Sequence, residues 1–195
     1  GLSEAQIASR FGITVTIVKR RLALARLLPE IRSMYRAGTA SIVELQALTL
    51  ASRAKQKEWL SLVDSPNQPA EWQVKDWVLG GESIAVSAAL FDVTEAKLAI
   101  TSDLFGDAQL FTDVARFWER QNAAIEAERS KLLGLGWSAV DVVPPGERFE
   151  QWKYAEASKA KGGRVVIEVE KDGTVTVHKG LLPHAEARKA NRGDG

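Results

Sequence analysis

Residues 3–26 have the sequence SEAQIASRFGITVTIVKRRLALAR, in which two short amphipathic stretches meet at Gly12. Ser3 is placed to cap a first helix that ends at Gly12, and Thr14 is placed to cap a second helix. Ala8 is small at the position where the second helix has to cross closely. Apolar side chains recur at helical spacing in both stretches. This pattern predicts two helices joined by a tight turn, the helix-turn-helix arrangement.

The apolar positions of this pair predict which side chains face inward, and the others predict a DNA-reading surface, because the N-terminal part of a recognition helix enters the major groove. The expected inward residues are Ile7, Phe11, Ile13, Val15, Val18, Leu22 and Ala25. Thr14 is expected to offer its hydroxyl and the helix N-terminus to a phosphate, and Val15 to divide its contacts between packing and a thymine methyl. The predicted DNA-contacting residues are Thr14, Val15, Thr16, Lys19, Arg20, Arg21 and Arg26, with Thr16, Lys19 and Arg20 directed at base edges or the flanking backbone and Arg21 and Arg26 at phosphates or acidic neighbours.

The basic charge of the chain is concentrated on the same segment. Residues 1–40 contain seven basic and two acidic side chains, a net charge of +5, although the whole chain has a net charge of only +1. Neutralisation of phosphates supplies most non-specific affinity for DNA, so this distribution supports a DNA-binding element. Two amphipathic helices joined at a glycine also occur in helical bundles that never touch DNA, and a charge run alone is often only a solvated face.

The composition excludes several classes of protein and site. The hydrophobic content of 45% over 195 residues is enough to bury a core. The chain has no cysteine, which excludes disulfides, cysteine-type zinc sites and thiol nucleophiles, and its only histidines are His178 and His184. A catalytic or metal site built on several histidines is therefore excluded, although carboxylate chemistry is not. We expect no catalytic site, no metal and no cofactor. No apolar run is long enough to span a bilayer, and we expect a cytoplasmic protein associated with the nucleoid or a plasmid, with no membrane partner.

The pattern along the chain predicts two domains, a mainly helical one over residues 1–80 and an α+β one over residues 81–195. Gly80 and Gly81 end the helical block and mark the boundary. The second domain is expected to combine a long helix with a small antiparallel sheet. Asp172-Gly173 lies between two β-branched runs and predicts the tight turn of a β-hairpin in that sheet. Its predicted elements are a helix over about 110–133, a strand over 137–143 and a hairpin over 164–179.

The segment 5–26 resembles the helix-turn-helix of ParB-type partition proteins. The match continues through Leu28-Pro29-Glu30, Tyr35-Arg36-Ala37-Gly38 and Leu45-Gln46-Ala47-Leu48, and Trp59 and Trp72 stand where the plasmid-borne branch places aromatics. Four later parts of the chain also resemble the C-terminal part of that branch. They are Thr101-Ser102-Asp103-Leu104-Phe105-Gly106-Asp107, the long charged helix, Leu135-Gly136-Trp137-Ser138-Ala139-Val140 and the hairpin before Gly180-Leu181.

This resemblance implies binding of a centromere-like duplex site, a ParA-type partner ATPase, a homodimer and a role in plasmid partition or chromosome segregation. Many members carry an N-terminal nuclease-like, nucleotide-binding domain, but its Gly-Glu-Arg-Arg box is absent here. Gly146-Glu147-Arg148 is followed by Phe149 and is interpreted as a turn. Val15 stands where many relatives have arginine, so a different DNA site is expected.

Two other functions are open at this point. One is a helix-turn-helix transcriptional regulator whose C-terminal part serves as a dimerisation or effector module. The other is an enzyme that uses carboxylates such as Asp103, Asp107 and Asp113, although no second group at motif spacing accompanies them. The tryptophans Trp59, Trp72 and Trp77 are expected to be core residues rather than base-stacking platforms.

Overall fold

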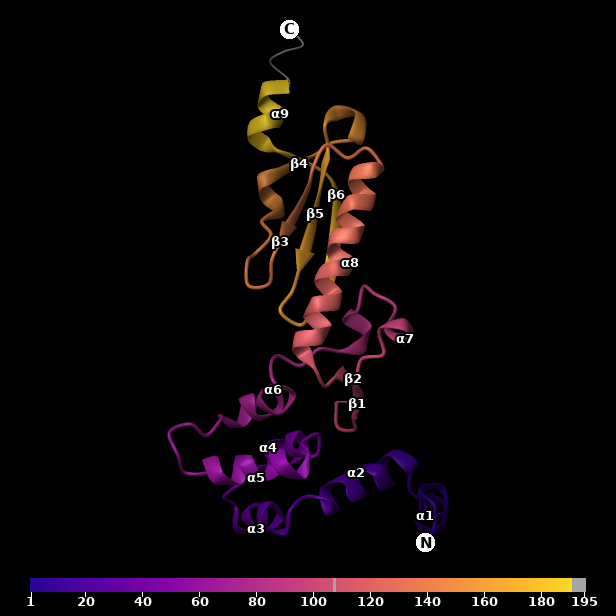
Figure 1. Ribbon diagram of the computed structural model, residues 1–195, viewed down its shortest axis with the longest axis vertical. Helices are drawn as coiled ribbons and strands as arrows, with labels where there is room; N and C mark the ends of the chain where they lie inside the picture. The colour runs from indigo at the N-terminus through magenta and orange to yellow at the C-terminus, as the bar shows by residue number, and fades with distance from the viewer. Residues whose placement is uncertain (107, 191–195) are drawn as a thin grey trace. The chain divides into compact units, whose positions relative to one another are not determined.

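The structure, a computed structural model, describes residues 1–106 and 108–190. They form two compact units: residues 1–86 with 98–114, and residues 87–97 with the described residues from 115 onward. The first unit contains mainly helices, and the second combines helices with a four-stranded sheet (Figure 1). The predicted mixed α+β class is therefore confirmed.

The helices of the first unit begin where the sequence places capping groups. Ser3 and Ser41 each form a capping box with the residue three positions later, and Pro29 occupies the first turn of its helix. Side-chain caps satisfy backbone N–H groups that have no partner inside the helix. The helical elements are α1 (Glu4–Phe11), α2 (Val15–Ala25), α3 (Pro29–Ala37), α4 (Ile42–Leu48), α5 (Arg53–Leu62), the 3-10 turn η1 (Glu71–Gln73) and α6 (Val74–Leu79).

One tryptophan lies at the centre of the core of this unit. Trp59 is fully buried, as predicted for a core residue, whereas Trp72 is 75% exposed and is not part of the core. Gln56 is buried on the same helix as Trp59, accepts a hydrogen bond from the Leu28 N–H at 3.0 Å and donates to two carbonyl oxygens. The buried cluster consists of Leu27, Leu28, Ile31, Ala40, Leu45, Ala47, Leu48, Trp59 and Val74.

A short hairpin returns to the first unit after the chain has left it. Strands β1 (Ile100–Asp103) and β2 (Ala108–Phe111) pair antiparallel, and Leu110 also forms a bridge with Ala85. The sequence predicts residues 110–113 as the start of the long helix, but Leu110 and Phe111 are buried in β2, and α8 (Val114–Gly134) begins later. Two adjacent apolar residues fit a strand as well as a helix, and the pairing with β1 decides between them.

The second unit is built on a sheet of order β3-β5-β6-β4. Strands β5 and β6 form the predicted hairpin, and β4 pairs antiparallel with the far end of β6. The strands are β3 (Val140–Val143), β4 (Tyr154–Glu156), β5 (Arg164–Val169) and β6 (Val175–Pro183), accompanied by the helical elements η2 (Val86–Ala88), α7 (Val93–Ala96), α8, η3 (Gln151–Lys153), η4 (Lys159–Lys161) and α9 (His184–Ala190).

The sequence predicts a small antiparallel sheet, and the antiparallel pairing of β5 with β6 agrees with it, but the four-stranded sheet as a whole is mixed. Strand β3 pairs parallel with β5, with Val140 opposite Val165 and Val142 opposite Ile167. Parallel pairing requires a long connection between the two strands, and residues 144–163, which include β4, provide it. The strand itself is shorter than predicted and begins at Val140 rather than at residue 137.

The long helix α8 covers one face of this sheet (Figure 1). Ile125 and Leu132 of α8 form one buried cluster with Val165 and Ile167 of β5. Removal of these aliphatic side chains from water stabilises the unit, at roughly 25 cal/mol per Å² of apolar surface.

Candidate nucleic-acid interface

The crossing of α1 and α2 depends on one glycine and two buried side chains. Gly12 has a φ of 62°, in the left-handed region where a residue without Cβ meets little strain. The N–H of the next residue, Ile13, donates to the Ala8 carbonyl at 3.1 Å and closes the turn. Ala8 and Val18 are 5% and 3% exposed, so the two helices meet through them.

Part of the predicted inward face of this pair is on the surface. Phe11 is 68% exposed, Val15 is 39% exposed, and Ala25 is also exposed. Ile7, Ile13 and Leu22 are half-buried. The helical period identifies one apolar side of α1, but α1 and α2 pack mainly on each other, and this leaves the outer part of that side uncovered.

The N-terminal turn of α2 carries polar side chains outward. The Thr14 hydroxyl Oγ1 accepts a hydrogen bond from the Ile17 N–H at 3.3 Å, so Thr14 acts as the N-cap of α2. Thr16 and Lys19 are exposed, and Lys19 pairs with no acidic side chain among the described residues. These two side chains lie three positions apart on α2 and therefore project from neighbouring parts of one face.

Arg20 has a different environment from Lys19. It is half-buried, its Nε donates to the carbonyl oxygen of Leu104, and its guanidinium lies 5.9 Å from the centre of the Phe105 ring. The predicted basic surface of α2 is therefore divided, because Lys19 is solvated and Arg20 is held by the loop between β1 and β2. Both Arg21 and Arg26 are exposed.

The loop that holds Arg20 is itself fixed by Asp103. This carboxylate accepts hydrogen bonds from the N–H groups of Phe105 and Gly106, each at 3.0 Å, and lies 2.6 Å from the Lys75 ammonium. Burial by itself raises the pKa of the Asp103 carboxyl, but Lys75 and the two N–H groups lower it more, and the pKa lies below its ordinary value of 3.8.

The carboxylates named as possible catalytic groups have different surroundings. Asp103 is ionised and bound to Lys75, so it serves as an anchor for the loop. Asp113 precedes α8 and is half-buried, and Asp107 lies outside the described residues. Within residues 1–106 and 108–190, no group of three or more histidine, aspartate or glutamate side chains is placed to hold a metal ion.

Sequence analysis did not identify Lys75, Leu104 and Phe105 as part of this site. A local signal existed, since aspartate commonly accepts hydrogen bonds from N–H groups two and three residues later. The contact of this turn with Arg20 has no local signal, because 84 positions separate Arg20 from Leu104.

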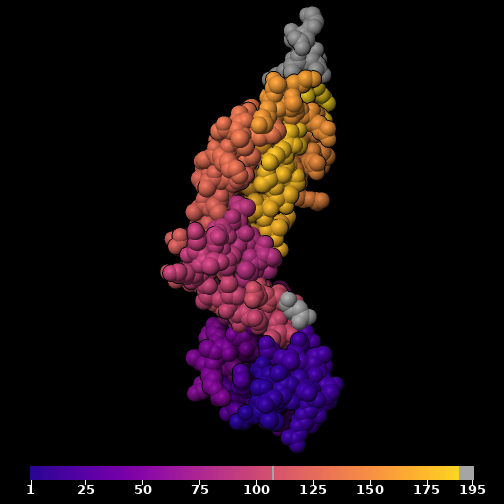
Figure 2. All heavy atoms as spheres, turned by 90° about the vertical axis from the view of Figure 1, so that its right-hand side faces the viewer, coloured from indigo at the N-terminus to yellow at the C-terminus, as the bar shows by residue number. Residues whose placement is uncertain are grey.

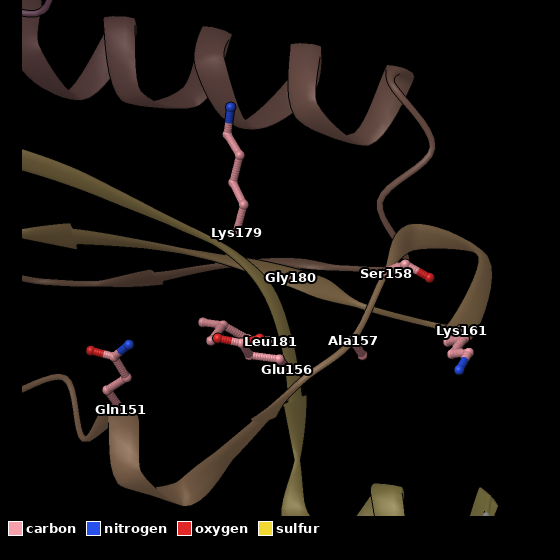
Figure 3. A pocket seen from close by; sticks show the side chains of 8 residues that line it. All are labelled: Gln151, Glu156, Ala157, Ser158, Lys161, Lys179, Gly180 and Leu181. Atoms are coloured by element: carbon pink, nitrogen blue, oxygen red, sulfur yellow. The ribbon is translucent and has the colours of Figure 1, made fainter.

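The second unit contains a shallow hollow beside β6, but its polar groups do not converge. Figure 3 shows the Lys179 side chain pointing away from Gln151 and Glu156, and Lys161 lying apart from both. The lining residues are Gln151, Glu156, Ala157, Ser158, Lys161, Lys179, Gly180 and Leu181.

Comparisons with known proteins identify no family for this chain. It matches no protein-family model, no curated protein and no solved structure. In the part of the chain that the structure describes, no helix has the length and apolar character needed to cross a bilayer.

Proposed function

We propose that this chain binds double-stranded DNA through α1 and α2, which act as a helix-turn-helix with the N-terminal half of α2 in the major groove. The observation that carries the proposal is the combination of the tight crossing at Ala8, Gly12 and Val18 with an outward face bearing Thr16 and Lys19. A closely crossed pair of helices presents its second helix as a rigid rod, which suits insertion into a groove about 12 Å wide.

Electrostatics supports the same surface. Arg10, Lys19 and Arg21 are exposed on α1 and α2, Arg26 is exposed directly after α2, and residues 1–40 have a net charge of +5. Each phosphate that such side chains neutralise releases counterions, which makes binding favourable at low salt. On this proposal Lys19 meets a base edge or the adjoining backbone, and Arg21 and Arg26 contact the flanking phosphates.

The biological role proposed is that of a plasmid or chromosome partition protein. The resemblance of segment 5–26 to ParB-type proteins supports a centromere-like site, a homodimer and a ParA-type partner ATPase. A dimer would read two half-sites spaced by about one helical turn, roughly 10 bp, or a multiple of it. The alternative role, a transcriptional regulator, uses the same helices, and it would be favoured if the selected site lay at the promoter of the chain's own gene.

The test is fluorescence anisotropy with duplexes selected from a randomised library, measured across a potassium chloride series. Lys19→Ala is compared with Lys57→Ala, which removes the same charge from an exposed position on α5. We expect Lys19→Ala to weaken binding to the selected duplex by about tenfold or more and to reduce the preference over a scrambled duplex. Lys57→Ala should preserve that preference.

The other outcomes are informative. If Lys19→Ala weakens both duplexes equally and reduces the salt slope by about one unit, Lys19 contacts a phosphate and not a base. If the folded wild-type chain binds no duplex at low salt, the proposed function is wrong.

A further inference from the structure

We infer that the loop Leu104–Gly106, anchored by Asp103 and Lys75, is a positioning device for the DNA-reading face of α2. This inference rests on the proposed function and adds residues from outside the helix pair to the reading site. Within the first unit, Figure 2 shows the segment near residue 105, in pink, adjoining the first helices, in indigo.

The contact is located at the edge of the reading face. An α-helix turns through about 100° per residue, so Arg20 lies on the same side of α2 as Thr16, one turn further along. Arg20 also directly follows Lys19. Whatever holds the Arg20 guanidinium therefore limits the rotation and tilt of the face that carries Thr16 and Lys19.

One of the groups that hold the Arg20 side chain is a backbone carbonyl. Nε of Arg20 donates to the Leu104 carbonyl, and the Phe105 ring lies beneath the guanidinium with its centre 5.9 Å away. A carbonyl has few degrees of freedom when its loop is fixed, so the contact has a defined direction. Charged donors to carbonyl oxygens are also stronger than neutral ones.

A buried carboxylate holds the loop. Asp103 is 7% exposed, accepts the N–H groups of Phe105 and Gly106 and pairs with Lys75 of α6. A Cβ at position 106 would collide with this carboxylate, so an alanine there would have to displace it from its present position. A path of contacts therefore runs from Lys75 through Asp103 and the loop to Arg20.

The path predicts that Asp103 influences sequence reading without touching DNA. Asp103→Asn should reduce the preference for the selected duplex over a scrambled one by about tenfold, the size expected for one charge-assisted contact. The matched control is Asp64→Asn, which removes the same charge from an exposed site with φ 62°, a conformation that asparagine tolerates. Gly106→Ala should act like Asp103→Asn although it leaves the net charge unchanged.

A double-mutant cycle separates positioning from general loss of stability. If Asp103 acts through Arg20, Asp103→Asn should cause little further loss of preference in an Arg20→Ala background. A second measurement needs no DNA: the rate at which the Arg20 Nε–H proton exchanges with solvent, followed by its NMR cross-peak. This exchange should be slow in the wild type and in Asp64→Asn. It should be faster in Asp103→Asn and Gly106→Ala, and circular dichroism establishes that these variants are folded.

The failure of this inference can be distinguished from failure of the proposed function. The positioning role alone is overturned if the wild type binds the duplex but the effects of Asp103→Asn and Arg20→Ala on preference are additive. It is also overturned if Asp103→Asn leaves the exchange rate of the Arg20 Nε–H unchanged. Absence of duplex binding by the wild type overturns both.

Discussion

The side-chain oxygen Oε1 of Gln121 accepts a hydrogen bond from the backbone N–H of Leu90 at 2.8 Å, which attaches the segment 87–97 to α8. The amide Nε2 of the same residue donates to the carbonyl oxygens of Ala88 and Gly173, both at 2.8 Å. Gln121 is fully buried. One side chain therefore satisfies three backbone groups from two loops inside the second unit.

Gln121→Leu should destabilise this unit strongly. Leucine has a similar volume but leaves the Leu90 N–H and two carbonyl groups without partners, and each such group costs about 1–3 kcal/mol when buried. We expect a loss of about 3 kcal/mol in the free energy of unfolding, measured by urea denaturation. Asn122→Leu, at the exposed neighbouring position, should change it by less than about 0.5 kcal/mol. Equal effects of the two substitutions would contradict this role of Gln121.

The ion pair of Lys75 and Asp103 makes the free energy of unfolding of the first unit depend on pH in the acidic range. The pKa of Asp103 is lowered in the folded protein, so the pair stabilises the fold above the unfolded value of 3.8 and loses this effect as the pH falls through the lower, folded value. Asp103→Asn should therefore lower the free energy of unfolding at neutral pH by about 1–3 kcal/mol. The difference from the wild type should decrease below about pH 4.

Urea denaturation of both proteins over an acidic to neutral pH series measures this difference. The exposed control Asp64→Asn should show little difference from the wild type at any pH. A constant gap between Asp103→Asn and the wild type down to the most acid conditions would show that the charge of Asp103 is not what stabilises the loop.

The close approach of α1 and α2 makes Ala8 sensitive to size. Ala8→Leu adds three carbon atoms at a position that is 5% exposed, and overpacking of this kind costs about 1–3 kcal/mol. We expect a lower melting temperature together with weaker duplex binding. Ala5→Leu, on the exposed side of the same helix, is the control and should preserve both properties. Normal duplex binding by Ala8→Leu would show that the crossing does not set the reading geometry.

Two glycines of the second unit should respond in opposite directions to substitution by alanine. A Cβ at Gly163 would collide with the Ala157 carbonyl and lie 2.8 Å from the Ser158 carbonyl oxygen, so Gly163→Ala should destabilise the turn before β5. Gly134 is at the end of α8 with nothing within 4 Å of an added Cβ. Gly134→Ala should stabilise the helix by up to about 1 kcal/mol. Thermal melts of both variants test the pair, and a stabilised Gly163→Ala would contradict the close approach.

Local sequence determined the beginnings of the helices and the tight turn between α1 and α2. Ser3 and Ser41 each form a capping box with the residue three positions later, and Gly12 adopts the positive φ of the turn without help from distant residues. Such interactions involve neighbours along the chain, so their signal is present in any short window of sequence. The basic segment 1–40 and the β5–β6 hairpin could be predicted for the same reason.

Tertiary structure alone decided the position of Arg20, the exposure of Phe11 and the parallel pairing of β3 with β5. The position of Arg20 and the pairing of β3 with β5 depend on segments that are far apart in sequence, and Phe11 is exposed because α1 packs mainly on α2. The sequence around Arg20 predicts an arginine on the outer side of a helix, but it does not indicate that its side chain donates to a carbonyl 84 residues later. The helix pair could be predicted because its partners are adjacent in sequence, whereas the contact of Arg20 with Leu104 could not, because only packing brings these two residues together.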